Sequence, residues 1–235
     1  MIRKESAGMD DYEISENIKR ILYNVGEAKA KYRKSDETVR IMAVTKTVPY
    51  ERVNAAVNEG ITLLGENRVQ EYFEKKDFYD KKAEINFIGH LQSNKIKYII
   101  DSVTMIHSVD SVKLASEIDR YAARSGRLMD VLIEVNIGEE ESKSGVLPDR
   151  LDELLGGVSE LKNIRVKGLM SIPPIGKSEE SFERLRRIFD DLKSAHYENT
   201  EMDILSAGMS ADYVSAVKYG SNIVRIGSGI FGSRK

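Results

Sequence analysis

The sequence predicts an α/β fold, a single (β/α)8 barrel of the TIM type, from three observations. Eight short apolar runs alternate with amphipathic segments from residue 40 onward. The chain has 235 residues, near the roughly 250 that such barrels usually need. No linker rich in Ser, Gly or Pro divides it, so we expect one domain over residues 1–235. An open, doubly wound sheet is the alternative, because periodicity alone does not establish closure of the sheet.

The first element is an amphipathic helix over about residues 11–34. Its apolar stripe has offsets of 4, 3, 1 and 3, typical of one helix face, and consists of Ile14, Ile18, Ile21, Leu22 and Val25. The last apolar run ends close to the C-terminus, so we expect no helix after it. The N-terminal helix is then expected to pack in the eighth outer position of the barrel.

The eight predicted strands are rich in Val and Ile and do not alternate strictly, as expected of parallel strands that are buried on both faces. They cover residues 40–46, 61–67, 84–90, 103–110, 129–138, 164–173, 201–209 and 222–229.

Helices are predicted between these strands. The clearest covers residues 178–192, with Glu179 and Glu180 in its first turn. Another covers residues 111–124, where apolar residues share one face. Shorter helices are expected after Pro49, Asn67, Ser93, Pro148 and Ser210.

The composition excludes several classes of function. The chain has no cysteine, which excludes disulfides, iron–sulfur clusters and thiol nucleophiles. The longest apolar run covers only residues 41–44, so we expect no membrane association. The charged N-terminal segment lacks the apolar core of a secretory signal, and we expect a cytoplasmic protein.

Charge and histidine content argue against nucleic acids and metals as ligands. The chain carries 36 Lys and Arg against 38 Asp and Glu, a net charge of −2. Its short basic clusters lie among acidic residues, which is typical of solvated helix faces rather than nucleic-acid surfaces. The three histidines, His90, His107 and His196, do not pair at the spacing of metal ligands. We therefore expect no metal site and no nucleic-acid partner.

Lys46 is the first candidate for chemistry, because it ends a buried strand. The active site of a (β/α)8 barrel lies at the carboxyl ends of its strands. A lysine amine in a partly desolvated cup is suited to Schiff-base formation, since desolvation favours the neutral amine. The alternative for Lys46 is an ion-paired or solvated residue at a strand end.

The loops after the seventh and eighth strands are the second candidate. Ser206 to Ser210 and Gly227-Ser228-Gly229 provide hydroxyls and backbone N–H groups at the usual phosphate site of this fold. They predict a phosphate-bearing ligand, unless the serines merely cap a helix and the glycines merely turn the chain. The match of residues 227–232 to a dinucleotide fingerprint is rejected, because no long helix follows and no acidic residue lies about 20 positions further on.

Three other features are ambiguous. Arg225 shares a strand face with Gly227 and could project inward, either toward a ligand or toward a carboxylate such as Glu66. His90 is interpreted as a ligand contact or acid–base group, or as a structural histidine bound to backbone. The charged loop 138–145 is either a mobile lid or a solvated surface segment.

Ordered motifs in the sequence resemble the pyridoxal phosphate (PLP) homeostasis proteins, which are related to the barrel domain of alanine racemase. The resemblance covers nearly all of residues 40–234. It is carried by VTK at 44–46, GENRVQE at 65–71, FIGHLQSNK at 87–95, HSVD at 107–110, KSG at 143–145, GLM at 168–170, LSAGMS at 205–210 and VRIG at 224–227.

The resemblance implies a fold-type III PLP barrel without the second domain of the racemase. It implies that Lys46 forms the internal aldimine and that Asn67 lies against the cofactor ring. It also implies that Ser206, Ser210, Gly227 and Ser228 hold the phosphate and that Arg225 faces the pyridine nitrogen. Three positions differ from the usual pattern of the family: Ala207, Ser228, and Asn86, where an aromatic residue or histidine is usual.

The function expected from these observations is PLP homeostasis: the chain holds PLP on Lys46 with little or no catalysis. An arginine beside the pyridine nitrogen disfavours a pyridinium, so the ring is a weaker electron sink. PLP-dependent apo-enzymes are the expected protein partners, and a monomer is expected because the racemase dimer surface is missing. The alternatives are a PLP enzyme such as an amino-acid racemase, with His90 as its base, and a cofactor-free Schiff-base aldolase acting on a sugar phosphate.

Overall fold

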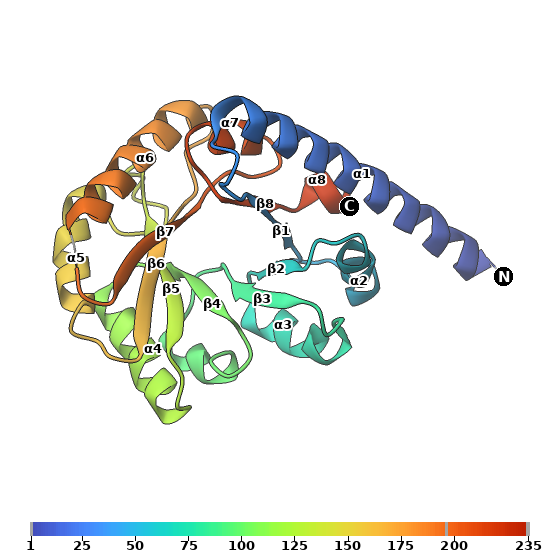
Figure 1. Ribbon diagram of the computed structural model, residues 1–235. Coiled ribbons are helices and arrows are strands. Elements are labelled where there is room, and N and C mark those ends of the chain that lie inside the picture. The colour runs from blue at the N-terminus through green and yellow to red at the C-terminus, as the bar shows by residue number, and fades with distance from the viewer. Residues whose placement is uncertain (1, 196, 234–235) are drawn as a thin grey trace.

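The computed structural model describes residues 2–195 and 197–233 and contains a closed barrel of eight parallel strands in the order β1 to β8 (Figure 1). The strands are β1 Arg40–Val44, β2 Leu63–Glu66, β3 Glu84–Phe87, β4 Met105–Val109, β5 Met129–Val135, β6 Ile164–Ser171, β7 Thr200–Ser206 and β8 Ile223–Ile226. The predicted (β/α)8 fold is confirmed, and the open sheet is wrong because β1 pairs with β8, Met42 opposite Arg225. Most strands are shorter at the carboxyl end than predicted.

Helices cover the outside of the barrel. The α-helices are α1 Ile2–Tyr32, α2 Tyr50–Asn58, α3 Val69–Lys75, α4 Val112–Arg124, α5 Leu151–Val158, α6 Ser178–Ala195, α7 Tyr213–Lys218 and α8 Ser228–Phe231. The described residues also form short 3-10 helices, η1 Lys76–Phe78, η2 Ser93–Tyr98 and η3 Pro148–Arg150. Ser111 caps α4 as expected of a helix-starting serine, because its Oγ accepts a hydrogen bond from Leu114 N.

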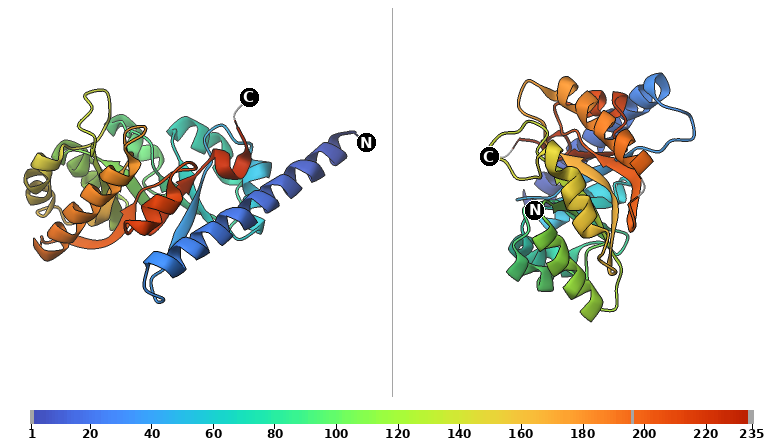
Figure 2. Two further views of the ribbon diagram at one scale, coloured as in Figure 1. Left: turned by 90° about the horizontal axis from the view of Figure 1, so that it is seen from above. Right: turned by 90° about the vertical axis from the view of Figure 1, so that its left-hand side faces the viewer.

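Helix α1 fills the eighth outer position, beside α7, α8 and α2, and projects past the barrel (Figure 1 and Figure 2). Asn17 Nδ2 donates to Ile230 O at 3.1 Å, and Asn24 Nδ2 donates to the Tyr213 hydroxyl at 2.9 Å. The predicted position is confirmed, although the helix begins well before the predicted start. Leu22, assigned to the apolar stripe, is 47% exposed, and Ala28 is buried in the stripe instead.

The C-terminal segment differs from the prediction, which placed no helix after the last strand. The one-turn helix α8 follows β8 directly, and its Ile230 and Phe231 are buried. Those two residues belong to the apolar core between the barrel and its outer helices, and α8 packs against α1. His196, Arg234 and Lys235 lie outside the described residues.

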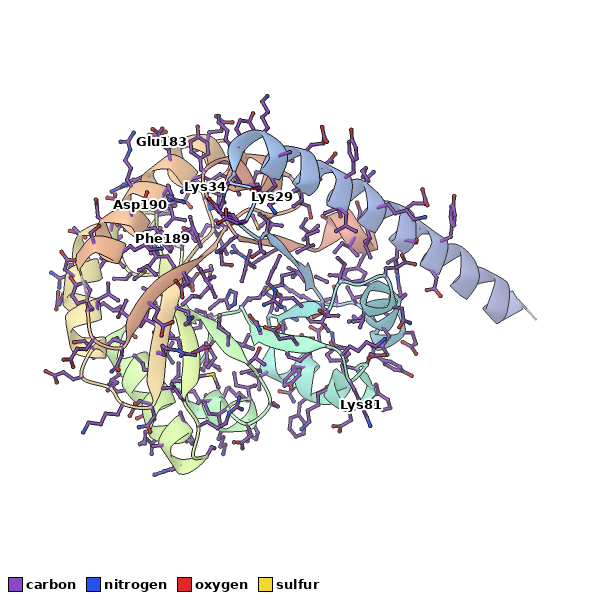
Figure 3. All side chains as sticks on the ribbon, in the orientation of Figure 1. Lys29, Lys34, Lys81, Glu183, Phe189 and Asp190 are labelled. Atoms are coloured by element: carbon purple, nitrogen blue, oxygen red, sulfur yellow. The ribbon has the colours of Figure 1, made fainter. Side chains whose placement is uncertain are left out.

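The core has two parts, and side chains fill both (Figure 3). The larger part lies between the strands and the helices and includes Val53, Ile118 and Phe182. The smaller part is inside the barrel, where one cluster contains Met42, Leu63, Ile88 and Ile223 and a second contains Met105, Leu132 and Met170. No described helix is long and apolar enough to cross a membrane.

Candidate functional site

A cavity of about 390 Å³ opens at the carboxyl ends of the strands, where the fold class predicts the site. Six of the seven predicted site residues line it: Lys46, Asn67, Ser210, Arg225, Gly227 and Ser228. Apolar contacts come from residues that include Ile88, Ile172 and Met209. The structure therefore brings together residues from well-separated parts of the sequence, as a small-molecule site requires.

Lys46 lies two residues beyond the end of β1, in a turn rather than in the strand. The turn is closed by a hydrogen bond from Val48 N to Thr45 O at 3.0 Å. The Lys46 side chain is half-buried, and among the described residues no hydrogen bond or ion pair engages its ammonium. The ion-paired alternative for Lys46 therefore finds no support, and its amine is available to a ligand.

Lys46 also faces a second, larger cavity of about 510 Å³. The two cavities share the wall formed by Val44, Lys46, Gly227 and Ser228. The second one extends outward past Arg52 toward α1. Asn67, Ser210 and Arg225 line only the smaller cavity, which is therefore the better match to the predicted ligand site.

The two predicted phosphate loops meet at the smaller cavity and are joined by a hydrogen bond. Gly229 N donates to Ser210 Oγ at 3.0 Å. The cavity wall includes Ser228, the first residue of α8, whose backbone N–H has no acceptor within the helix. Gly208 has φ of +90°, and a Cβ there would lie 2.5 Å from the Ala216 Cβ, so the loop conformation requires glycine.

Ser206 is the predicted residue that the structure does not place on the cavity wall. Its side chain is fully buried, and its Oγ accepts a hydrogen bond from Arg225 Nη1 at 2.8 Å. Burial lowers the Arg225 pKa to about 10, a value that keeps the guanidinium protonated at neutral pH. Ser206 therefore supports Arg225 from within the barrel.

Arg225 is fixed from two sides. Besides the bond to Ser206, its Nη2 donates to the Ser171 carbonyl oxygen at 2.9 Å. The alternative pairing of Arg225 with Glu66 is wrong: Glu66 Oε1 instead accepts from the Tyr79 hydroxyl and lies 3.7 Å from Lys75 Nζ.

Three polar residues inside the barrel were missed as functional candidates. His107 Nε2 and Asn86 Oδ1 form a hydrogen bond of 2.8 Å, and burial together with Arg225 lowers the His107 pKa to about 3. Burial and nearby Asp110 raise the Glu134 pKa to about 7, against the opposing charge of Arg225. The alternation of side chains along a strand could have found them, because every second residue points to the same side. By this spacing each of the three shares a side with an apolar residue of the barrel interior: Asn86 with Ile88, His107 with Met105 and Glu134 with Leu132.

His90 and the loop 138–145 remain at the surface. His90 is exposed and does not line the smaller cavity. Asn136 anchors the loop, since its Nδ2 donates to Glu140 O at 2.8 Å and its Oδ1 accepts from Glu140 N at 3.2 Å. Among the described residues, no three His, Asp or Glu side chains are grouped so that they could hold a metal ion.

Comparison with known proteins identifies relatives. The family model described as "Alanine racemase, N-terminal domain" matches residues 17–235. A pyridoxal phosphate homeostasis protein of Aquifex aeolicus is 40% identical over 225 residues, covering 94% of this chain and 98% of that protein. The structure of PipY of Synechococcus elongatus with PLP bound has a TM-score of 0.78 at 29% identity and covers 93% of this chain and 100% of PipY.

An alanine racemase from Corynebacterium glutamicum is similar in fold. Its TM-score is 0.72 at 14% identity, and the match covers 95% of this chain and 62% of the racemase. The racemase therefore extends well beyond the part that matches this chain.

Proposed function

The chain belongs to the family of pyridoxal phosphate homeostasis proteins, and we propose that it binds PLP in the 390 Å³ cavity as a Schiff base on Lys46, with little or no catalysis. The observation that carries the proposal is the convergence of the Lys46 amine, the two loops and Arg225 on one cavity.

The residues present fit this cofactor. Asn67 lines the cavity, and its Oδ1 is buried without a hydrogen-bond partner among the described residues, so a ligand that donates to it would satisfy it. The start of α8 and the loop at Ser210 provide neutral donors for a phosphate. When bound, PLP supplies an aldehyde that condenses with a primary amine and a conjugated ring that withdraws electrons.

The chain's own residues then define what the site does. Lys46 supplies the primary amine. Arg225 is held by Ser206 and Ser171 and remains cationic, and in this proposal it would face the ring nitrogen. A cationic donor beside that nitrogen opposes its protonation, and the unprotonated ring stabilises a carbanion less well. These properties favour storage of PLP over turnover of amino acids.

The racemase alternative requires a base that faces Lys46 across the ligand. His90, the residue considered for that role, is exposed and does not line the cavity. His107 is inside the barrel, but its lowered pKa and its bond to Asn86 make it a poor proton acceptor. Family membership also disfavours the cofactor-free aldolase.

The proposal extends to partners and location. We place the chain in the cytoplasm as a monomer that exchanges PLP with PLP-dependent apo-enzymes. Sedimentation of the purified chain tests the monomer, and transfer of PLP to an apo-enzyme in a two-protein mixture tests the exchange.

The main experiment is an absorbance spectrum before and after borohydride, followed by peptide mapping of the fixed PLP. We expect a yellow protein whose absorbance band disappears on reduction, with the adduct on Lys46. Lys46→Ala should remain folded and lose the band, while the matched Lys95→Ala should keep it. An adduct on Lys95 or Lys143 would overturn the assignment, and racemisation of alanine or serine with kcat of about 1 s⁻¹ or more would overturn the storage function.

A further inference from the structure

The turn that carries Lys46 is strained. Thr47, its next residue, has φ of +62°, a left-handed conformation that β-branched residues rarely adopt. Such a conformation costs free energy and persists only where surrounding contacts hold it. The turn therefore needs an anchor, and helix α3 provides one.

Lys75, at the end of α3, is that anchor. Its residue is only 9% exposed, and its Nζ donates to the carbonyl oxygens of Thr45 at 3.0 Å and Val48 at 3.3 Å, which flank the turn. A third bond goes to Glu71 Oε1 at 2.8 Å. An ammonium has three N–H donors, so all of those on Lys75 are used.

Glu71 connects the same ammonium to the strained residue. It lies one helical turn before Lys75 on α3, and its Oε1 also accepts a hydrogen bond from Thr47 N. Glu66 adds a second carboxylate, 3.7 Å from Lys75 Nζ and fully buried. Burial raises the Glu66 pKa, while the Tyr79 hydroxyl and Lys75 act in the opposite direction.

We propose that Lys75 is a positioning residue for Lys46: it holds the turn 45–48 so that the Lys46 amine is presented to the cavity. The inference rests on the proposed function, since it assigns a role in forming the Schiff base. The same contacts account for why Lys46, and not the nearby Lys75, would form the Schiff base. Lys75 has every donor engaged and is buried with carboxylates, whereas Lys46 has no partner among the described residues.

The test compares the rate at which apo-protein forms the Schiff base, measured by absorbance after mixing with PLP. Lys75→Met removes the ammonium and keeps a flexible apolar side chain of similar length. Because charge-assisted hydrogen bonds are lost, we expect the rate to fall about tenfold or more. The matched control is Lys76→Met, since the neighbouring lysine lies over the Phe73 ring and does not touch the turn; its rate should stay within about twofold.

A second substitution distinguishes positioning from a general loss of structure. Thr47→Gly removes the strain, because glycine adopts positive φ without penalty. The effect of Lys75→Met should therefore be several-fold smaller in the Thr47→Gly background. Thermal unfolding of each apo-protein identifies variants that do not fold. If Lys75→Met is one of them, Glu71→Gln replaces it, and a rate reduction in the same direction is expected.

Two results would overturn the positioning role. One is a folded Lys75→Met or Glu71→Gln protein that reacts within about twofold of wild type. The other is an effect of Lys75→Met that is equally large with and without the Thr47→Gly substitution. Failure of the proposed function looks different. In that case the wild-type chain and Lys76→Met would themselves fix no PLP on Lys46 after borohydride, whatever the residue at position 75.

Discussion

The two interiors of this barrel differ in chemistry. The layer between strands and helices is largely apolar, with fully buried residues such as Val53, Ala115 and Ile118. Its main polar exception is the buried pair of Glu66 and Lys75 beside α3. The space inside the barrel contains apolar clusters at Met42 and Leu132. It also contains a polar group of residues: Asn86, His107, Glu134, Ser206 and Arg225.

The outer layer therefore contributes mainly to stability, and the inner space mainly to the ligand site. Burial of apolar surface in the outer layer stabilises the fold with little dependence on pH. Buried polar groups require hydrogen bonds and have shifted pKa values, so the inner space contributes less stability and responds to pH. The ligand cavity opens onto the inner space, where Arg225 belongs to both the polar group and the cavity wall.

The largest expected effect is in the outer layer. Phe182→Ala deletes a ring of α6 that is 2% exposed, so the free energy of unfolding should fall by about 3–5 kcal/mol. Urea unfolding measures this change. PLP affinity of the folded variant should stay near wild type, and a loss of affinity as large as the loss of stability would contradict the separation. Phe73→Ala, at a residue 51% exposed, is the control and should cost less than about 1 kcal/mol.

The second effect concerns pH and the inner space. The pKa of Glu134 is raised to about 7 in the fold, so the folded state holds this proton more tightly than the unfolded state. The free energy of unfolding therefore decreases as pH rises from about 4.5 to about 7, by on the order of a few kcal/mol. Glu134→Gln should remove this decrease, so that its stability relative to wild type is greater at pH 8 than at pH 5.

The control for Glu134 is Glu153→Gln on α5, an exposed carboxylate paired with Arg150. Its removal should leave the pH dependence of stability unchanged. Denaturant unfolding at pH 5 and pH 8 compares the three proteins. Identical profiles for wild type and Glu134→Gln would show that the inner space is no more sensitive to pH than the outer layer.

The third prediction concerns the hydrogen bond by which Ser206 holds Arg225. Ser206→Ala removes the hydroxyl that accepts from Nη1 and leaves a buried charged donor with one partner fewer, which should cost about 1–3 kcal/mol of stability. Ser194→Ala, whose exposed hydroxyl bonds to its own helix, should change stability by less than about 0.5 kcal/mol. A larger change in PLP affinity than in stability would mean that Ser206 contacts the phosphate instead.

The smallest effect is expected at the rim of the cavity. Ser210→Ala removes the bond from Gly229 N that joins the two loops, with an expected cost of about 0.5–1.5 kcal/mol in PLP affinity. Equilibrium titration with PLP measures it. If Ser210→Ala lost more free energy of PLP binding than Ser206→Ala loses in free energy of unfolding, the half-buried bond would matter more than the buried one, contrary to this expectation.

Much of the fold and of the cavity was predictable. Apolar periodicity located α1, the eight strands and α6, and the fold class put the site at the carboxyl ends of the strands. Six of the predicted site residues do line the cavity. The bounds were less accurate, as at Lys46, because the end of a strand depends on pairing with its neighbours and not on the run of apolar residues.

The direction of individual side chains was not predictable. Ser206 could equally have faced a ligand or the barrel interior, and only the register in which β8 pairs with β7 brings Arg225 against it. Leu22 fits the stripe of α1 by spacing, but the stripe that is buried depends on how α1 lies between α7 and α2. The anchor of the Lys46 turn joins residues 45–48 to Lys75, a contact that no local pattern contains.

The sequence by itself determined the class of fold, the order of its elements and the motifs that place the chain in its family. These follow from local periodicity and from residue types in order, which do not change when the chain folds. Tertiary structure alone decided which polar side chains meet inside the barrel. It also decided that, among the described residues, Lys75 is fully hydrogen-bonded and Lys46 is not. Those outcomes depend on distances between strands and helices far apart in the chain, and on the loss of water that makes each buried hydrogen bond matter.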